Sequence, residues 1–192
     1  MQELKDRIVK EGKVLPGNII KVDGFLNHRI DTELMDHIAE EFGKHFNMDE
    51  VSLILTAEAS GIALSAIVAQ HFHKPMIFAK KAKSDNIEGG LYQSDIFSYT
   101  YKKKVTLLVS KEWMSSDDKV LIIDDFMANG EAMRGLCDIV EAAGATLVGI
   151  GCAVEKGFQG GGDRLRAAGV NLHSLAIIES AEPGNIVFRD EN

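Results

Sequence analysis

The sequence predicts an α/β fold in which a mostly parallel sheet carries helices on both faces. From Val51 to Ile178, short β-rich apolar runs alternate with segments whose apolar residues recur at helical spacing. This alternation is typical of β–α–β units joined by right-handed crossovers. The run 120–123 is apolar throughout and 145–154 is apolar apart from Thr146, as expected for strands buried on both faces. A length of 192 residues suits one domain with a sizeable core.

The segments before the sheet are expected to be largely helical. Residues 1–12 place apolar side chains among charges at helical spacing, and Asp31 is positioned to cap a second helix whose apolar side extends to Phe42. A loop and a mixed apolar and polar segment, 18–31, lie between these two helices. The central sheet is therefore expected to begin only after Val51.

The region after Val51 divides into strands, helices and loops. Residues 84–92 are polar, contain glycine and lack periodicity, so they predict a loop whose length suggests a lid. Two β-rich segments after this loop predict a hairpin-like arm. The expected elements are a strand 53–56, a turn 57–61 and a helix to residue 72; a short strand before Lys80; arm strands 95–101 and 104–110; a strand 145–154; a helix 163–168; and strands 172–178 and 186–188.

The most informative stretch runs from Lys119 to Val140. The run 120–123 predicts a buried strand, and Asp124 and Asp125 are expected at its carboxyl end. Residues 128–131 form a short turn, after which the apolar residues recur on one helical face. The unit is therefore a strand, an acidic pair, a glycine turn and a helix.

This unit has a chemical interpretation. A turn that leads into a helix offers unpaired backbone N–H groups to an anion, and ligands of open α/β sheets collect beyond the carboxyl ends of the strands. Two neighbouring carboxylates do not favour that anion, so they are expected to face sugar hydroxyls, a divalent cation or both. A phosphorylated sugar satisfies both demands. The alternative is that Asp124 and Asp125 only begin a solvated loop or cap the helix, since Asn-Gly is a common turn.

The segment VLIIDDFMANGEA, residues 120–132, resembles the phosphoribosyl diphosphate (PRPP) signature of the type I phosphoribosyltransferases. The resemblance implies that Asp124 and Asp125 are catalytic and hold the ribose hydroxyls, and that the loop Ala128, Asn129, Gly130, Glu131 and Ala132 holds the 5′-phosphate. Asn129, Glu131 and Ala132 replace residues more usual in the family, and hydroxyl donors are missing. Backbone N–H groups are therefore expected to carry most of the phosphate binding, with Glu131 pointing away.

Four blocks, KVDGFLNHRID, EASGIA, IIDDFMANGEA and EKGFQ, resemble the bacterial xanthine phosphoribosyltransferases in the same order and across nearly the full length. The resemblance implies a type I phosphoribosyltransferase fold forming a single domain, with N-terminal helices and a hood over the base in 1–50, a core sheet in 51–180 and a C-terminal strand and tail in 181–192. It also implies transfer of the phosphoribosyl group of PRPP to N9 of xanthine, Mg²⁺ held mainly through PRPP, and a homodimer.

The resemblance also assigns the remaining site residues. The pyrophosphate loop is Glu58, Ala59, Ser60 and Gly61; the base-binding residues are Ile20, Asn27, Lys156 and Phe158; and Lys81 and Lys83 belong to the lid. Some of these residues have a simpler alternative, because Asn27 can cap a turn, Phe158 can be core, and lysines in loops and at strand ends are ordinarily solvated.

Composition limits the other function classes. A net charge of −8 and a pI near 5.2 argue against nucleic-acid binding. The N-terminus lacks the apolar core of a signal peptide and no run is long enough to span a bilayer, so a cytoplasmic protein without a membrane partner is expected. Cys137 and Cys152 are expected to be buried free thiols.

Three other functions share some features of this sequence or lack their own motifs in it. An enzyme that prefers guanine or hypoxanthine shares the PRPP motifs, and so does a non-catalytic purine regulator that senses PRPP. The regulator needs a part that reads DNA, and no basic helix-turn-helix pattern precedes Val51. A kinase or a dinucleotide enzyme lacks its glycine-rich motif here.

Overall fold

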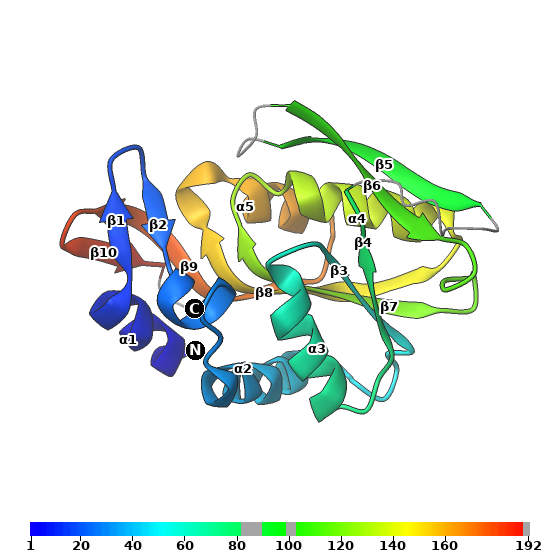
Figure 1. Cartoon of the computed structure of the whole chain (residues 1–192), viewed down its shortest axis with the longest axis horizontal. Coiled ribbons are helices and arrows are strands. Elements are labelled where there is room, and N and C mark those ends of the chain that lie inside the picture. The colour runs from blue at the N-terminus through cyan, green and yellow to red at the C-terminus, as the bar shows by residue number, and fades with distance from the viewer. Residues whose placement is uncertain (82–89, 99–102, 190–192) are drawn as a thin grey trace.

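The fold is centred on a six-stranded sheet in the order β10-β9-β8-β7-β3-β4 (Figure 1), seen in a computed structural model that describes residues 1–81, 90–98 and 103–189. Neighbouring strands run parallel except β10, which pairs antiparallel with β9 at one edge. The predicted mostly parallel sheet is thereby confirmed. The strands are β3 (Leu53–Ala57), β4 (Met76–Ala79), β7 (Lys119–Met127), β8 (Thr146–Lys156), β9 (Leu172–Glu182) and β10 (Asn185–Phe188).

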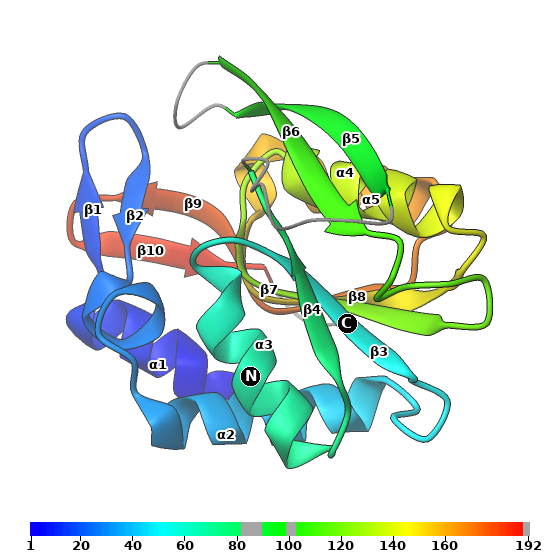
Figure 2. The same cartoon turned by 45° about the vertical axis from the view of Figure 1, so that its right-hand side comes forward.

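Helices cover both faces of the sheet, as predicted. On one face lie α1 (Gln2–Glu11), α2 (Thr32–His45) and α3 (Gly61–His71), and on the other lie α4 (Glu131–Ala142) and α5 (Gly161–Ala167) (Figures 1 and 2). Successive side chains of a strand point to opposite faces. In β7, Ile123 accordingly packs into the core beneath α2 and α3, and Ile122 into the core beneath α4. Asp31 caps α2 through a hydrogen bond from the Leu34 N–H, as predicted.

Two antiparallel hairpins extend from the sheet (Figure 2). The predicted arm is formed by β5 (Leu91–Ser98) and β6 (Lys103–Ser110), which pack on α4. Gly135 allows this approach, because a Cβ there would collide with the Ile96 side chain. The second hairpin, β1 (Lys13–Leu15) and β2 (Ile19–Lys21), leads into a single π-helical turn, η1 (Asp23–Asn27). Sequence patterns did not identify this hairpin.

Some predicted boundaries were wrong. β7 continues to Met127, so Asp124 and Asp125 lie inside the strand and not after it. The reason is that an apolar run ends at its first charged residue, whereas the backbone ladder continues through residues whose side chains find polar partners. α5 begins at Gly161 and not at Asp163, and it follows a short 3₁₀ turn, η2 (Gly157–Gln159).

Two further observations complete the fold. The thiols of Cys137 and Cys152 are free, as predicted, but only Cys152 is fully buried; the partial burial of Cys137 raises its pKa to about 11. In the described part of the chain, none of the helices has both the length and the apolar character that a membrane crossing requires.

Candidate active site

A cavity of about 210 Å³ lies at the carboxyl ends of β3 and β7. The parallel register of β3, β7 and β8 brings their following loops to this edge, as the sequence predicted. The cavity is lined by Ala57, Glu58, Ser60, Lys81, Ile96, Phe97, Asp124, Phe126, Met127, Ala128, Asn129, Gly130, Glu131, Ala132 and Met133. The expected phosphate loop, part of the expected pyrophosphate loop and Asp124 therefore share one cavity, to which the arm adds Ile96 and Phe97.

The two aspartates face opposite layers of the protein. Asp124 lines the cavity on the α4 side, whereas the adjacent Asp125 points to the α3 side, as alternation along a strand requires. Asp125 accepts hydrogen bonds from Ser60 Oγ and Asn27 Nδ2, each at 2.8 Å. One carboxylate thus connects β7, the loop before α3 and the turn η1.

Asp124 is a buried carboxyl group. Its exposed fraction is 7%, and its Oδ1 accepts the backbone N–H of Asp125 at 3.0 Å. Burial raises the pKa of Asp124 well above its ordinary value, and the neighbouring charge of Asp125 raises it further. The hydrogen bond from the backbone and the charge of Lys81 oppose this shift. The cavity therefore contains a carboxyl group that holds its proton more tightly than an exposed aspartate does.

The loop between β3 and α3 packs closely on Asp124. A Cβ at Gly61 would collide with Thr56 Oγ1 and Asp124 Oδ1, so this position has room only for hydrogen. The Glu58 carboxylate accepts the Lys81 N–H at 2.5 Å, which joins the loop to the end of β4. The Glu58–Ala59 peptide bond is cis. Glu58 and Ser60 line the cavity, whereas Ala59 and Gly61 are not among its lining residues.

The expected phosphate loop connects β7 to α4. Gly130 has φ 79°, a left-handed conformation that suits glycine. Asn129 Oδ1 accepts the Glu131 N–H at 3.4 Å. The Glu131 carboxylate is bound by Arg134 Nη2 at 3.3 Å and by the Phe97 N–H at 3.4 Å. These contacts direct the Glu131 charge toward α4 and the arm.

The expected base-binding residues lie on the side of the β1–β2 hairpin. Lys156 Nζ donates to the Asn18 carbonyl at 3.0 Å and lies 5.5 Å from the centroid of the Phe126 ring. Burial lowers the pKa of Lys156. Ile20 is 8% exposed and Phe158 packs against the same core. The four expected base-binding residues, Ile20, Asn27, Lys156 and Phe158, do not belong to the lining of the cavity, whereas Phe126 does.

Of the two lysines expected in the lid, the structure describes only Lys81. Lys81 lines the cavity next to Glu58. Lys83 falls outside the described residues, as does most of the loop 84–92.

Sequence reasoning missed two residues that contact the site. Phe126 follows the acidic pair directly, and its ring lies beneath Lys156; its place inside the motif was the available signal. Arg164 Nη2 donates to the Asn129 carbonyl at 2.9 Å from a distant helix. No local sequence pattern indicates that contact, because it depends on how α5 packs against the loop.

Comparisons with known proteins agree with this geometry. A family model described as a phosphoribosyl transferase domain matches residues 25–166. The chain is 51% identical to a xanthine phosphoribosyltransferase of Bifidobacterium adolescentis, with 98% of this chain and 100% of the relative covered. It is 52% identical to the xanthine phosphoribosyltransferase of Lachnoclostridium phytofermentans, with 100% of both chains covered.

A solved structure shows the same fold at lower identity. The adenine phosphoribosyltransferase of Giardia lamblia, complexed with 9-deazaadenine, superposes with a TM-score of 0.75 at 20% identity, with 90% of this chain and 96% of that chain covered. This similarity concerns the fold alone. The match over residues 25–166 and the two full-length relatives go further, and the chain therefore belongs to the phosphoribosyltransferase family.

Proposed function

We propose that the protein is a purine salvage enzyme that transfers the 5-phosphoribosyl group of PRPP to N9 of xanthine, giving xanthosine 5′-monophosphate and pyrophosphate. The observation that carries the proposal is the single cavity shared by Asp124, the loop Ala128–Ala132 and the loop at Glu58 and Ser60. The choice of base rests on the full-length relatives, which are named for xanthine.

The cavity offers a site for each part of PRPP. Backbone N–H groups of residues 128–132 at the start of α4 suit the 5′-phosphate. Asp124 suits the ribose hydroxyls, which can donate to its carboxylate oxygens, whereas Asp125 lies outside the cavity lining and would act by holding Ser60 and Asn27 in place. The loop at Glu58–Gly61 suits the pyrophosphate. When the bond from C1 to pyrophosphate breaks, the sugar becomes cation-like, and carboxylates fixed beside it stabilise that charge.

The cavity can accept Mg²⁺ that arrives bound to the phosphates of PRPP, because the protein needs to add only one or two carboxylates. Within the ranges that the structure describes, no three or more His, Cys, Asp or Glu side chains form a group that could hold a metal ion. Mg²⁺ is commonly bound through one or two carboxylates together with substrate phosphates. Asp124 and Glu58, which both line the cavity, are the candidate carboxylates. Bound there, the metal would offset the negative charge of the pyrophosphate.

Base recognition is assigned to Asn27 and Lys156. Xanthine has oxygens at C2 and C6, so its pocket needs a hydrogen-bond donor for each. The Lys156 ammonium donates to a backbone carbonyl in this structure and can donate to a base oxygen instead. Asn27 gives one amide N–H to Asp125 and has a second to offer. Ile20 and Phe158 supply apolar surface.

The direct test is release of pyrophosphate when the protein is mixed with PRPP, Mg²⁺ and one base at a time. Transfer to xanthine at higher kcat/KM than to guanine or hypoxanthine would support the proposal. Preference for either of those bases would move the assignment to a different salvage enzyme. PRPP binding with no pyrophosphate release for any base would favour the sensing regulator.

Replacing Lys156 with methionine is expected to lower kcat/KM for xanthine about tenfold to a hundredfold, because a hydrogen bond from a charged donor is lost. The thermal midpoint should change little, since methionine keeps most of the apolar stem. Lys10→Met, on the exposed side of α1, is the matched control and should behave like the unaltered protein. Steady-state kinetics with unchanged kcat/KM in Lys156→Met would contradict the assignment.

A further inference from the structure

The strongest unassigned feature near the cavity is the contact between α5 and the phosphate loop. Arg164 donates from Nη2 to the Asn129 carbonyl at 2.9 Å and from Nη1 to the Gln159 carbonyl at 3.4 Å. Beside it, Gly161 lies directly on the loop backbone: a Cβ there would be 2.5 Å from the Ala128 oxygen and 2.7 Å from the Gly130 nitrogen. A side chain at Gly161 would therefore push the loop away from α5.

The contact from Arg164 determines how one loop peptide is oriented. A trans peptide unit is planar, so its C=O and N–H point in opposite directions. With the Asn129 carbonyl held by Arg164, the Gly130 N–H points away from the Arg164 guanidinium. Gly130 has a left-handed φ of 79° and belongs to the cavity lining. Arg164 thus fixes one of the N–H groups that the proposed phosphate site needs.

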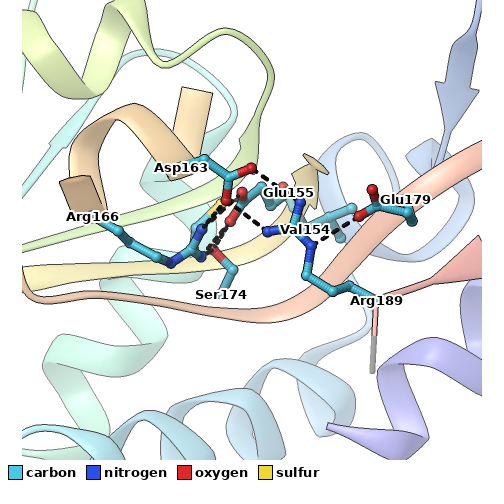
Figure 3. A network of polar contacts seen from close by, with 8 residues as sticks. Val154, Glu155, Asp163, Arg166, Ser174, Glu179 and Arg189 are labelled. Atoms are coloured by element: carbon cyan, nitrogen blue, oxygen red, sulfur yellow. Dashed lines mark hydrogen bonds and ion pairs between the residues drawn. The ribbon is translucent and has the colours of Figure 1, made fainter. Parts of the chain in front are cut away.

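Arg164 is not required to attach α5 to the sheet, because other residues of α5 do so (Figure 3). Arg166 makes two hydrogen bonds to the buried Glu155 carboxylate, at 2.6 and 3.1 Å. Arg189 makes two to Asp163, at 2.6 and 3.1 Å. Arg164 itself is exposed, and within the described ranges it donates to backbone carbonyls and forms no ion pair.

Charge adds to the effect of the contact. Glu58 and the buried Asp124 are among the residues that line the cavity, and the chain as a whole carries a net charge of −8. An anionic phosphate beside these groups gains from a nearby fixed cation. The guanidinium of Arg164 is held against the loop backbone by its bond to Asn129, which places it to supply this charge.

We propose that Arg164 is a positioning residue for the 5′-phosphate of PRPP, acting through the Asn129–Gly130 peptide of the loop. The proposal rests on the function proposed above and adds a residue from outside the PRPP motif. It makes a specific statement: Arg164 governs affinity for the phosphate of the ribose and has little influence on the pyrophosphate, whose expected loop at Glu58–Gly61 it does not contact.

Calorimetric titration with ribose 5-phosphate and with pyrophosphate separates the two effects. Arg164→Met is expected to weaken ribose 5-phosphate binding about fivefold to tenfold, and pyrophosphate binding less than about twofold. Arg164→Lys, which keeps a cationic donor, should recover much of the lost affinity. Thermal midpoints within about 2 °C of each other would show that all the variants are folded, because Arg164 is exposed.

Arg189→Met is the matched control, because it removes the same charge and loosens the same helix at Asp163 without touching the loop. Ribose 5-phosphate binding within about twofold of the unaltered protein is expected for this variant. Equal weakening by Arg189→Met and Arg164→Met, equal weakening of both ligands, or full affinity in Arg164→Met would overturn the assignment. Absence of ribose 5-phosphate binding in the unaltered protein would overturn the proposed function as well, whereas normal binding by all variants would overturn only the role of Arg164.

Discussion

Replacing Asp124 with asparagine is expected to lower kcat/KM for PRPP about a hundredfold and at the same time to stabilise the folded protein near pH 7. The loss of activity follows from removing a preorganised carboxyl group beside a sugar that becomes cation-like. The gain in stability follows from burial, since Asp124 is 7% exposed and its pKa is raised mainly by desolvation. Steady-state kinetics and urea unfolding measure the two effects separately.

The pH dependence of this gain has a defined sign. The pKa of Asp124 in the folded protein is above its unfolded value, so between the two values the folded state keeps a proton that the unfolded chain has lost. Stability therefore falls as the pH rises through that window. Asparagine has no proton to lose, so the advantage of Asp124→Asn should be present above the window and should disappear below about pH 4.

A charge control separates burial from net charge. Asp117→Asn removes an exposed carboxylate from the loop before β7 and should leave both activity and stability near their starting values. Normal PRPP kinetics in Asp124→Asn would contradict the assignment of Asp124 to the ribose. A variant that was less stable than the unaltered protein at pH 7 would show that its carboxylate is better solvated than its burial indicates.

Arg166→Met is expected to lower the free energy of unfolding by about 3 kcal/mol, the lower end of the range for breaking a buried ion pair. Glu155 has no exposed surface, whereas the side chain of Arg166 is 29% exposed. Removal of Arg166 leaves a buried carboxylate with Ser174 as a hydrogen-bond partner, through a bond of 2.5 Å. Urea unfolding at neutral pH measures the change.

The reciprocal variants test this explanation. Glu155→Gln should cost less than Arg166→Met, because the partly exposed guanidinium can turn toward water. The double variant Glu155→Met and Arg166→Met should recover a large part of the loss, since an apolar pair leaves no charge uncompensated. If the double variant lost the sum of the losses of Glu155→Met and Arg166→Met measured singly, the ion pair would not be the source of the effect.

Local patterns predicted the centre of the site because its parts are contiguous in the chain. Strand, acidic pair, glycine turn and helix follow one another from Lys119 to Ala142, and the structure places Asp124 and the loop 128–132 at one cavity. The alternation of a strand also explains why Asp125 faces the other layer, although sequence reasoning treated the two acids as equivalent and ended the strand before them.

The rest of the site depends on contacts between distant segments. Asn27 meets Asp125 across 98 positions, and Lys156 meets Asn18 across 138. Periodicity and turn signals describe a residue and its neighbours, so they contain no information about such pairs. For the same reason the sequence did not predict the ion pair between Glu155 and Arg166. Glu155 is a charged residue at the end of an apolar strand, and Arg166 was predicted only to belong to a short helix.

The opposite orientations of Asp124 and Asp125 restrict how the gene can vary. A deletion or insertion of one codon between Val120 and Asp124 would invert every later side chain of β7, because a strand repeats every two residues. Ile122 and Ile123 would exchange cores, and the acid at the cavity would exchange with the acid beneath Asn27. Length changes in β7 therefore damage packing and substrate contacts together.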